Sequence, residues 1–297
     1  MNLAIVGLGS MGKNHYRVLK RMDNVTVTAL CDIQKNEDFY EPFYTDLDTM
    51  LKNEPIDALI IAVPTFLHKE IALKAIEYGK DVFIEKPAAS TIEDAYEILH
   101  AANQKGVKSC VGHVERFNPA ITHLKNELKN KIIYTIEITR IGPFPPRISD
   151  VGVLTDLAVH DIDLIRFITG KDILQTSIYK SRKIHNHHED NAVLSLLLED
   201  EIVANITTNW LTPFKRRKVE VACKEVYYEA DLIGQTLHAY SDFQTDNSYR
   251  TRDIHIKKDE PLYKELEAFI HYLQSGDRGN LASIEDSIET LRITQAK

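Results

Sequence analysis

The sequence predicts an α/β fold in which a doubly wound parallel sheet is followed by an α+β part with an open, mainly antiparallel sheet. Up to about Gly112, short apolar segments alternate with helical ones, as strands and connecting helices do in parallel sheets. From Ile173 to about Ile256, strand-like segments follow one another with only polar turns between them. We therefore expect a first domain at 1–118 and a second at 119–297, whose C-terminal helices can pack back on the first.

The composition is that of a globular protein with room for two cores: 297 residues, 43% hydrophobic and 27% charged. The net charge of -8, with no basic run longer than Lys215–Lys218, argues against nucleic acid or an anionic membrane as partner. No basic leader follows Met1 and no apolar run approaches about 18 residues, so we expect a cytoplasmic protein. Cys31, Cys110 and Cys223 are odd in number and far apart, which indicates buried thiols.

The first apolar strand, Leu3–Val6, leads into a G-x-G-x-x-G motif at Gly7–Gly12, and helical character follows from His15 to Met22. Glycines at these positions allow a tight turn and let the backbone approach a pyrophosphate at a helix N-terminus. The strand–glycine loop–helix context predicts a Rossmann domain that binds a dinucleotide, against the simpler interpretation of a turn without phosphate. The expected contacts in this loop are Gly7, Gly9, Ser10, Met11 and Gly12.

A second β-branched strand, Val25–Cys31, ends at Asp32, twenty residues beyond Gly12. A carboxylate there can accept a hydrogen bond from a ribose 2′-hydroxyl and would repel a 2′-phosphate. NAD is therefore favoured over NADP, although a basic neighbour such as Lys35 could reverse the preference.

The remainder of the first half continues the alternation. Gln34–Tyr44 is too short for the usual crossover helix and is expected to be a shortened loop. We expect helices at 46–52, 66–78 and 92–104 and further strands at 56–63, 81–84 and 107–111, so that a six-stranded sheet is complete by about Gly112.

The strand ending at Ile84 runs directly into Glu85-Lys86-Pro87. Open α/β sheets bind ligands at the carboxyl ends of their strands. Pro87 biases Lys86 away from helical geometry, which would hold its amine in one place. The competing interpretation is an ordinary exposed Lys-Pro turn.

The second half begins with a helix from Asn118 to about Lys129 and a half-buried strand at 132–141, followed by a stiff loop, Gly142–Pro146. A strongly amphipathic helix is expected at 154–168, and two more helices at 261–273 and 283–294. An open antiparallel sheet covered by helices on one face has another face to bury, so we expect a homodimer or homotetramer.

Asp156 and His160 are four residues apart in the helix predicted at 154–168, so they share one of its faces. An acid placed there can orient an imidazole, which is the arrangement that a general base needs. Asp163 lies on a similar side, whereas Asp161 points elsewhere. An exposed helix with a salt-linked histidine is the competing interpretation.

His185-Asn186-His187-His188 suggests a metal site, but adjacent histidines point to opposite sides of a strand and no suitably spaced cysteine or acid pair completes a ligand set. A polar turn is the better prediction, and we expect no metal.

Taken together, Gly7–Gly12, Pro64 with His68, Glu85-Lys86-Pro87, and Asp156 with His160 and Asp163 resemble, in order and spacing, the Gfo/Idh/MocA oxidoreductases. The resemblance implies a nucleotide domain, an open-sheet domain, NAD(P), and a sugar or cyclitol substrate. It implies that Lys86 binds the reacting hydroxyl, that Asp156 positions substrate or assists proton transfer, and that His160 is the general base. Asp161 and Asp163 match flanking positions with a structural role. The implied cofactor contacts outside the glycine loop are Asp32, Pro64, His68, Glu85 and Lys86.

Gly112–Pro119, Gly142–Arg147 and Asn209–Pro213 look like the branch of this family that includes UDP-N-acetylglucosamine 3-dehydrogenases. The shortened segment after Asp32 departs from the usual family pattern. Arg116 could instead only link domains, and Lys215–Lys218 could be a charged edge strand. The substrate contacts that this likeness implies are His113, Arg116, Asn118, Arg147 and the Lys215–Lys218 run, beside Lys86, Asp156 and His160.

We therefore expect an NAD-dependent dehydrogenase that takes a hydride from a secondary hydroxyl of a sugar or nucleotide sugar, with C3 of UDP-N-acetylglucosamine as the first candidate. The alternatives are an inositol or monosaccharide dehydrogenase and a non-catalytic, NAD-sensing regulator of the same fold.

Overall fold

The protein is described by a computed structural model covering residues 1–35, 39–145 and 151–296. The chain divides into two compact units. The first comprises Met1–Val114 and Leu262–Arg292, and the second comprises Glu115–Pro261 and Ile293–Lys297. The units divide after residue 114, four residues before the expected boundary, and the predicted domain organisation stays a prediction.

The first unit contains a six-stranded sheet in which every neighbouring pair is parallel, in the order β3-β2-β1-β4-β5-β6. This confirms the doubly wound prediction, and the strand order reverses between β1 and β4, where such sheets bind ligands. The strands are β1 (Asn2–Val6), β2 (Thr26–Cys31), β3 (Phe43–Tyr44), β4 (Ala58–Ile61), β5 (Asp81–Glu85) and β6 (Ser109–Gly112). The sequence did not reveal β3, because a strand of two residues carries no periodic signal.

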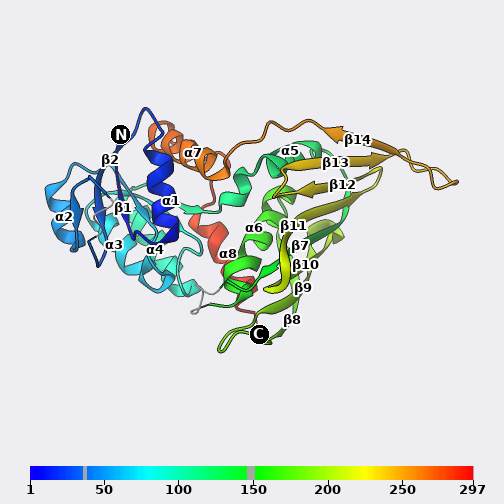
Figure 1. The fold of residues 1–297 in the computed structure, drawn as a ribbon, viewed down its shortest axis with the longest axis horizontal. Coiled ribbons are helices and arrows are strands. Elements are labelled where there is room, and N and C mark those ends of the chain that lie inside the picture. Colours follow the sequence, from blue (N-terminus) through cyan, green and yellow to red (C-terminus); the bar gives the residue numbers. More distant parts are fainter. Residues whose placement is uncertain (36–38, 146–150, 297) are drawn as a thin grey trace. The chain divides into compact units, whose positions relative to one another are not determined.

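Helices surround this sheet (Figure 1). Thr91 caps the start of the longest crossover helix by accepting from the backbone N–H of Asp94, and Gly106 ends that helix in the left-handed conformation, as expected for a glycine there. The helices are α1 (Ser10–Leu19), α2 (Leu47–Asn53), α3 (His68–Glu77), α4 (Ile92–Lys105), α7 (Pro261–Ser275) and α8 (Ile284–Thr294), with a 3₁₀ turn η1 (Thr65–Leu67) before α3.

The C-terminal helices are tied to the first unit by backbone and side-chain bonds. Val111 in β6 pairs with Ala282 just before α8, and the backbone N–H of Ala88 donates to the Ser287 hydroxyl at 3.0 Å. The chain thus leaves the first unit after residue 114 and returns to it near residue 262.

The second unit is built on an eight-stranded sheet in the order β14-β13-β12-β11-β7-β10-β9-β8, with one parallel pair, β7 and β10. This confirms the open, mainly antiparallel sheet. Its strands are β7 (Ile133–Pro143), β8 (Ile173–Ser181), β9 (Asn191–Leu198), β10 (Val203–Asn209), β11 (Leu211–Cys223), β12 (Val226–Asp231), β13 (Thr236–Ser241) and β14 (Arg250–Ile254), and its short helical segments are η2 (Val114–Phe117) and η4 (Glu199–Glu201).

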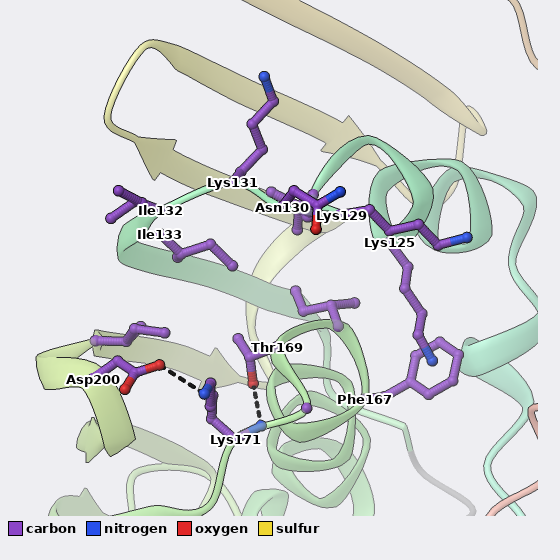
Figure 2. A pocket seen from close by; sticks show the side chains of 14 residues that line it. Lys125, Lys129, Asn130, Lys131, Ile132, Ile133, Phe167, Thr169, Lys171 and Asp200 are labelled. Atoms are coloured by element: carbon purple, nitrogen blue, oxygen red, sulfur yellow. Dashed lines mark hydrogen bonds and ion pairs between the residues drawn. The ribbon is translucent and has the colours of Figure 1, made fainter.

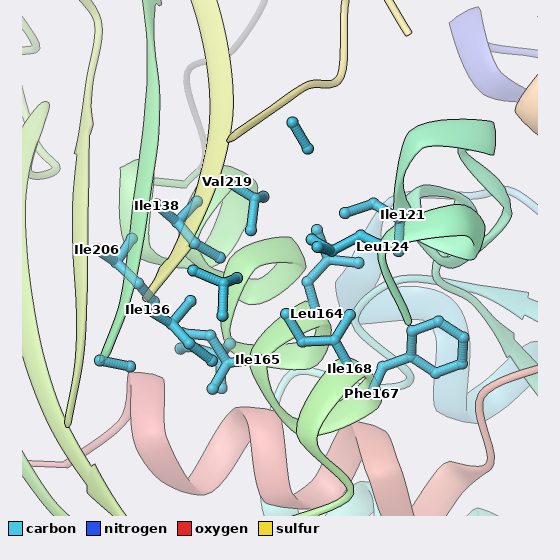
Figure 3. Packing of buried hydrophobic residues seen from close by; sticks show 14 of the residues in the cluster. Ile121, Leu124, Ile136, Ile138, Leu164, Ile165, Phe167, Ile168, Ile206 and Val219 are labelled. Carbon is cyan, nitrogen blue, oxygen red and sulfur yellow. The ribbon is translucent and has the colours of Figure 1, made fainter. Parts of the chain in front are cut away.

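Two helices, α5 (Pro119–Glu127) and α6 (Val159–Thr169), cover one face of this sheet (Figure 1). Alternate residues of the central strands face them, and Figure 3 shows the resulting core. It brings together Ile136, Ile138, Ile206 and Val219 from the sheet, Leu164, Ile165, Phe167 and Ile168 from α6, and Ile121 and Leu124 from α5.

The helix predicted at 154–168 is present, since helical structure runs from Leu154 to Thr169, but it differs from the prediction in two respects. Residues Leu154–Ala158 form a π-turn, η3, and α6 begins only at Val159. Glu189 holds the start of this segment: its backbone carbonyl accepts from Val153 and its carboxylate accepts from the N–H of Leu154 at 3.1 Å. The helix is also buried on nearly every side, so it is not the strongly amphipathic helix that was expected.

Candidate active site

The glycine loop of the first unit is closed tightly by its own backbone. Gly7 has φ of 90°, and a Cβ on it would lie 2.6 Å from the backbone of Ala62 and Val63. A Cβ on Gly12 would collide with the carbonyl group of Gly7, whereas one on Gly9 would meet nothing within 4 Å. Gly9 is the N-cap of α1 and has no side chain to cap the helix. The loop therefore presents open space and helix N–H groups, which fit a pyrophosphate.

Asp32 follows β2 directly and faces this loop. Its Oδ2 accepts a hydrogen bond of 2.5 Å from the backbone N–H of Leu8. The structure thus places Asp32, the residue predicted to bind the ribose, next to the loop predicted to bind phosphate. Ser10 and Met11, the other loop residues named from the sequence, open α1 and are exposed.

His68, at the start of α3, connects two of the predicted cofactor loops. Its Nδ1 lies 2.9 Å from the carbonyl oxygen of Pro87, and its Nε2 lies 2.9 Å from that of Val63, which precedes the exposed Pro64. Burial lowers the pKa of His68 despite the two carbonyl groups, which favour the protonated ring. The side chain holds the loop after β4 against the loop after β5.

Lys86 is half-buried at the carboxyl end of β5, and the Lys86–Pro87 peptide is cis. The preceding Glu85 is buried, and its Oε1 lies 2.6 Å from Nε2 of His15 in α1. Burial alone would raise the pKa of Glu85, but the hydrogen bond with His15 and the charges of His15 and Lys86 lower it below its ordinary value. A buried carboxylate therefore lies directly before the lysine.

Sequence reasoning missed His15. The available signal was its place in the first helix, three residues after the last motif glycine, but a lone histidine in a helix has no partner that the sequence can identify. Its partner Glu85 is 70 residues away in the chain.

In the second unit, His160 is half-buried in the first turn of α6, and Asp156 is half-buried in the preceding π-turn. The neighbouring Asp161 and Asp163 are buried and accept hydrogen bonds from arginines. Nε of Arg140 donates to Asp161 at 2.8 Å, and Arg116 binds Asp163 through two bonds of 2.8 and 2.5 Å. These contacts support the structural role implied for both aspartates.

Arg140 also donates to Glu115, at 2.8 Å, and Arg217 approaches the same Glu115 oxygen at 3.1 Å. Burial would raise the pKa of Glu115, but the two arginines lower it. Burial dominates at Asp161 instead, and raises its pKa to about 6 although Arg140 opposes the shift. Its second oxygen, Oδ2, is buried without a hydrogen bond among the described residues, and the negative charge of Glu115 also raises the pKa of Asp161.

The other predicted substrate contacts have different surroundings. Arg116 and Asn118 are buried inside the second unit, where Asn118 caps α5 and donates to the carbonyl of Leu232 at 2.9 Å. His113 is buried after β6 in the first unit. Arg147 lies outside the described residues, and so do some residues of the loop that contains it.

The His185–His188 segment forms a turn around Asp190, whose carboxylate accepts from the backbone N–H groups of Lys183, Ile184 and His185. Nδ1 of His185 accepts from the N–H groups of His187 and His188, which places it in the turn itself. Within the described ranges, no group of three or more His, Cys, Asp or Glu side chains could hold a metal ion.

A cavity of about 580 Å³ lies at the opposite end of α6 from His160 (Figure 2). It is lined by the end of α5, the start of β7 and the end of α6, with several lysines at its rim. Nζ of Lys125 lies 3.4 Å from the centre of the Phe167 ring, and Lys171 pairs with Asp200 at 2.6 Å. Because His160 is in the first turn of α6, this cavity is not part of its site.

Both halves of the chain match models of one oxidoreductase family. Residues 1–113 match its NAD-binding Rossmann fold, and residues 133–229 match its C-terminal domain. The protein is by class a member of an oxidoreductase family with an NAD-binding Rossmann fold. It belongs to the Gfo/Idh/MocA family.

Curated relatives include UDP-N-acetylglucosamine 3-dehydrogenase of Acidithiobacillus ferrooxidans, which is 25% identical over 91% of this chain and 88% of its own length. Myo-inositol 2-dehydrogenase of Thermotoga maritima is 24% identical over 93% of this chain and 89% of its own length. The uncharacterized oxidoreductase YrbE of Bacillus subtilis is 29% identical over 68% of this chain, and that match spans 65% of YrbE.

Among solved structures, the Acidithiobacillus ferrooxidans UDP-N-acetylglucosamine 3-dehydrogenase GnnA superposes with a TM-score of 0.90 at 22% identity, covering 99% of this chain and 95% of that chain. An Agrobacterium radiobacter oxidoreductase solved with NAD⁺, L-tartaric acid and magnesium has a TM-score of 0.88 at 18% identity, covering 100% of this chain and 94% of that chain. These similarities show the fold. No helix in the described part of the chain is long and apolar enough to cross a membrane.

Proposed function

We propose that the protein oxidises a secondary hydroxyl of a sugar or nucleotide sugar with NAD⁺, and that C3 of UDP-N-acetylglucosamine is the first substrate to test. The observation that carries the proposal is the placement of Lys86 at the carboxyl end of β5, directly after a buried carboxylate that pairs with His15. The second support is the set of half-buried Asp156 and His160 on the other unit.

NAD⁺, when bound, supplies the nicotinamide that accepts the hydride. The ammonium of Lys86 would bind the reacting hydroxyl and stabilise the negative charge that develops on its oxygen. Neutral His160 would take the hydroxyl proton as general base, and Asp156 would position the substrate or the imidazole. The alcohol then loses one proton and one hydride, so that a ketone, NADH and a proton are the products.

We assign the cofactor contacts to the glycine loop, Asp32, and the two loops held by His68. The Asp32 carboxylate is fixed against the loop by Leu8 and favours a free 2′-hydroxyl over a 2′-phosphate, so we propose NAD as the cofactor. NADP binding is expected to be weaker.

The nucleotide-sugar substrate is supported by the 25% identity to a UDP-N-acetylglucosamine 3-dehydrogenase over most of the chain. Lys215 and Arg216 are exposed in β11 and remain candidates for contacting its diphosphate. The buried ion pair of Arg116 leads us to assign it a structural role. A cyclitol substrate is the second candidate, because an inositol dehydrogenase is similar at 24% identity.

The decisive experiment measures nicotinamide absorbance when the protein and NAD⁺ are mixed in parallel with UDP-N-acetylglucosamine, myo-inositol and glucose. Each mixture is repeated with a 2-oxo acid as acceptor, and the sugar product is analysed, since a cofactor that is retained and recycled would give no net absorbance. Lys86→Ala should abolish turnover and leave NAD binding nearly intact, while Lys105→Ala, at an exposed position near the end of α4, should match the wild type.

A signal with UDP-N-acetylglucosamine alone, lost in Lys86→Ala, establishes the proposed substrate, and its Km should rise with salt because a diphosphate is recognised by charge. A signal with myo-inositol alone transfers the assignment to the cyclitol. NAD binding without turnover in any mixture contradicts the proposal for these substrates and favours a cofactor-sensing regulator or another substrate.

We also propose a homodimer or homotetramer that buries the open face of the second sheet. Tyr179, Val193 and Val203 are 74%, 39% and 43% exposed on strands whose other face is covered. Light scattering should give a mass of at least two chains, and Val203→Lys, at the start of β10 on this face, should lower it. A monomeric wild type would refute this assembly.

A further inference from the structure

Each aspartate beside His160 is bound by an arginine from a different element of the same unit. Asp161 is bound by Arg140 of β7, and Asp163 is bound by Arg116 of η2. All four side chains are at least nine-tenths buried. Burying ionised groups is costly, and apolar residues can often replace such pairs without loss of stability, so stability alone is a weak reason for two of them.

The two aspartates lie on either side of the direction in which His160 projects. An α-helix has 3.6 residues per turn, so Asp161 lies about 100° from His160 in one sense and Asp163 lies about 60° from it in the other. His160 itself is half-buried, whereas every residue from Asp161 to Ile165 is buried. A rotation of α6 about its axis in either sense would stretch one of the two ion pairs.

The first arginine, Arg140, is held in place by the sheet and by a second carboxylate. Arg140 lies in β7, which is hydrogen-bonded on both sides, to β10 and β11. Nη1 of Arg140 donates to Glu115, and that carboxylate is also approached by Arg217 of β11. Arg140 therefore connects α6 to the centre of the sheet.

The second arginine, Arg116, contacts α6 at two successive turns. Besides its two bonds to Asp163, Arg116 places its guanidinium carbon 5.0 Å from the centre of the Phe167 ring, four residues further along the helix. Lys125 of α5 lies over the same ring, as Figure 2 shows. Cations over an aromatic face are attracted to it, so Phe167 adds to the hold on α6.

We propose that Arg140 and Arg116 are positioning residues that fix the rotation of α6 and thereby aim the imidazole of His160. The inference rests on the proposed function, in which His160 accepts the substrate proton. The two pairs oppose rotation of α6 in opposite senses, in addition to the packing of its apolar residues in the core. Neither arginine is proposed to contact the reacting atoms.

The test uses Arg116→Lys and Arg140→Lys, which keep the positive charge but lose the planar guanidinium that binds a carboxylate through two donors. We expect kcat with UDP-N-acetylglucosamine to fall about 100-fold in each, as a misplacement of about 1 Å can produce. NAD affinity should be unchanged, because the proposed cofactor contacts lie in the other unit. Arg166→Lys is the matched control, since Arg166 is on the same helix and pairs with the exposed Asp172.

A second measurement does not depend on turnover. The imidazole NMR resonances of His160, identified by their loss in His160→Asn, should shift or broaden in both lysine variants and stay unchanged in Arg166→Lys. Absence of turnover in the wild type would count against the proposed function alone, and the spectra would still test positioning. Unchanged His160 resonances in both lysine variants would overturn the inference, whatever the activity.

A third variant separates positioning from stability. Arg116→Met combined with Asp163→Leu replaces the ion pair with apolar side chains and is expected to melt within a few degrees of the wild type. Its kcat should nevertheless stay about 100-fold low. Recovery of both the melting temperature and kcat in this double variant would show that the pair only fills space, and would refute the proposal.

Discussion

The packing of the glycine loop predicts opposite effects for two Gly→Ala substitutions that are two residues apart. In Gly7→Ala, the new Cβ meets the backbone of Ala62 at 2.6 Å, and the residue must keep φ near 90°. The unfavourable backbone conformation costs about 1–3 kcal/mol, and a forced contact in a packed region costs about 1–3 kcal/mol more. The sum is about 2–6 kcal/mol, a large share of the roughly 5–15 kcal/mol that stabilises a typical protein.

In Gly9→Ala, the Cβ meets nothing within 4 Å, and the φ of -66° is accessible to any residue. Stability should therefore stay within about 0.5 kcal/mol of the wild type. The new methyl group would nevertheless stand where the proposed function places the pyrophosphate, so the Kd for NAD should rise at least about tenfold, equivalent to about 1.4 kcal/mol.

The assay is urea unfolding together with calorimetric NAD titration of both variants and the wild type. Gly7→Ala should shift the unfolding midpoint strongly, and Gly9→Ala should leave it in place while weakening NAD binding. A Gly7→Ala variant as stable as the wild type would refute the packing argument. A Gly9→Ala variant with wild-type affinity would show that the cofactor does not approach this glycine.

Three further outcomes follow from the buried ionisable groups. The pKa of Asp161 is raised from 3.8 to about 6, so the free energy of unfolding should fall by roughly 3 kcal/mol in all as the pH rises between these two values. Asp161→Asn should remove this pH dependence. Parallel pH profiles of stability for the two proteins would contradict the prediction. Burial lowers the pKa of His68, so the buried neutral imidazole stabilises the folded protein above the ordinary histidine pKa, and this stabilisation is lost as the pH falls below about 6.5. His68→Asn should therefore flatten the acid side of the curve of unfolding free energy against pH. Burial raises the pKa of the Cys31 and Cys223 thiols to about 11 and that of the Cys110 thiol well above its ordinary value. A thiol reagent at neutral pH should therefore label none of the three until the protein is unfolded. Rapid labelling of the native protein would contradict their burial.

Local sequence patterns were sufficient to predict the position of a candidate residue where the neighbouring residues in the chain determine it. The sequence predicted that the glycine loop lies between a strand and a helix and that Asp32 follows the second strand, and β1, α1 and β2 have these positions. The position of Lys86 at the end of a strand was predictable because an apolar strand stops there at a charged residue and a proline. In each case the relevant geometry is set within about ten residues, which a pattern can capture.

Patterns failed where the partner of a residue is distant in sequence. The helix that contains Asp161 and Asp163 was predicted to be strongly amphipathic, yet both aspartates are buried. Arg140 and Arg116, which are 21 and 47 residues away in the chain, supply their hydrogen bonds. His15 was overlooked for the same reason. Acids in a helix have the same pattern whether solvent or a buried arginine faces them.

The surroundings of Glu85 and of Asp161 explain how two similar buried carboxylates acquire opposite pKa shifts. Glu85 pairs with His15 and lies beside Lys86, and these positive groups overcome the burial that alone would raise its pKa. Asp161 has Arg140, but Arg140 is shared with Glu115, and half of the Asp161 carboxylate is buried without a hydrogen bond among the described residues. The ionised form of Glu85 is thus stabilised directly before the proposed catalytic lysine. The carboxylate of Asp161, next to His160, is costly to ionise, so its ion pair with Arg140 adds little stability. This is consistent with the proposed role of the pair in positioning α6.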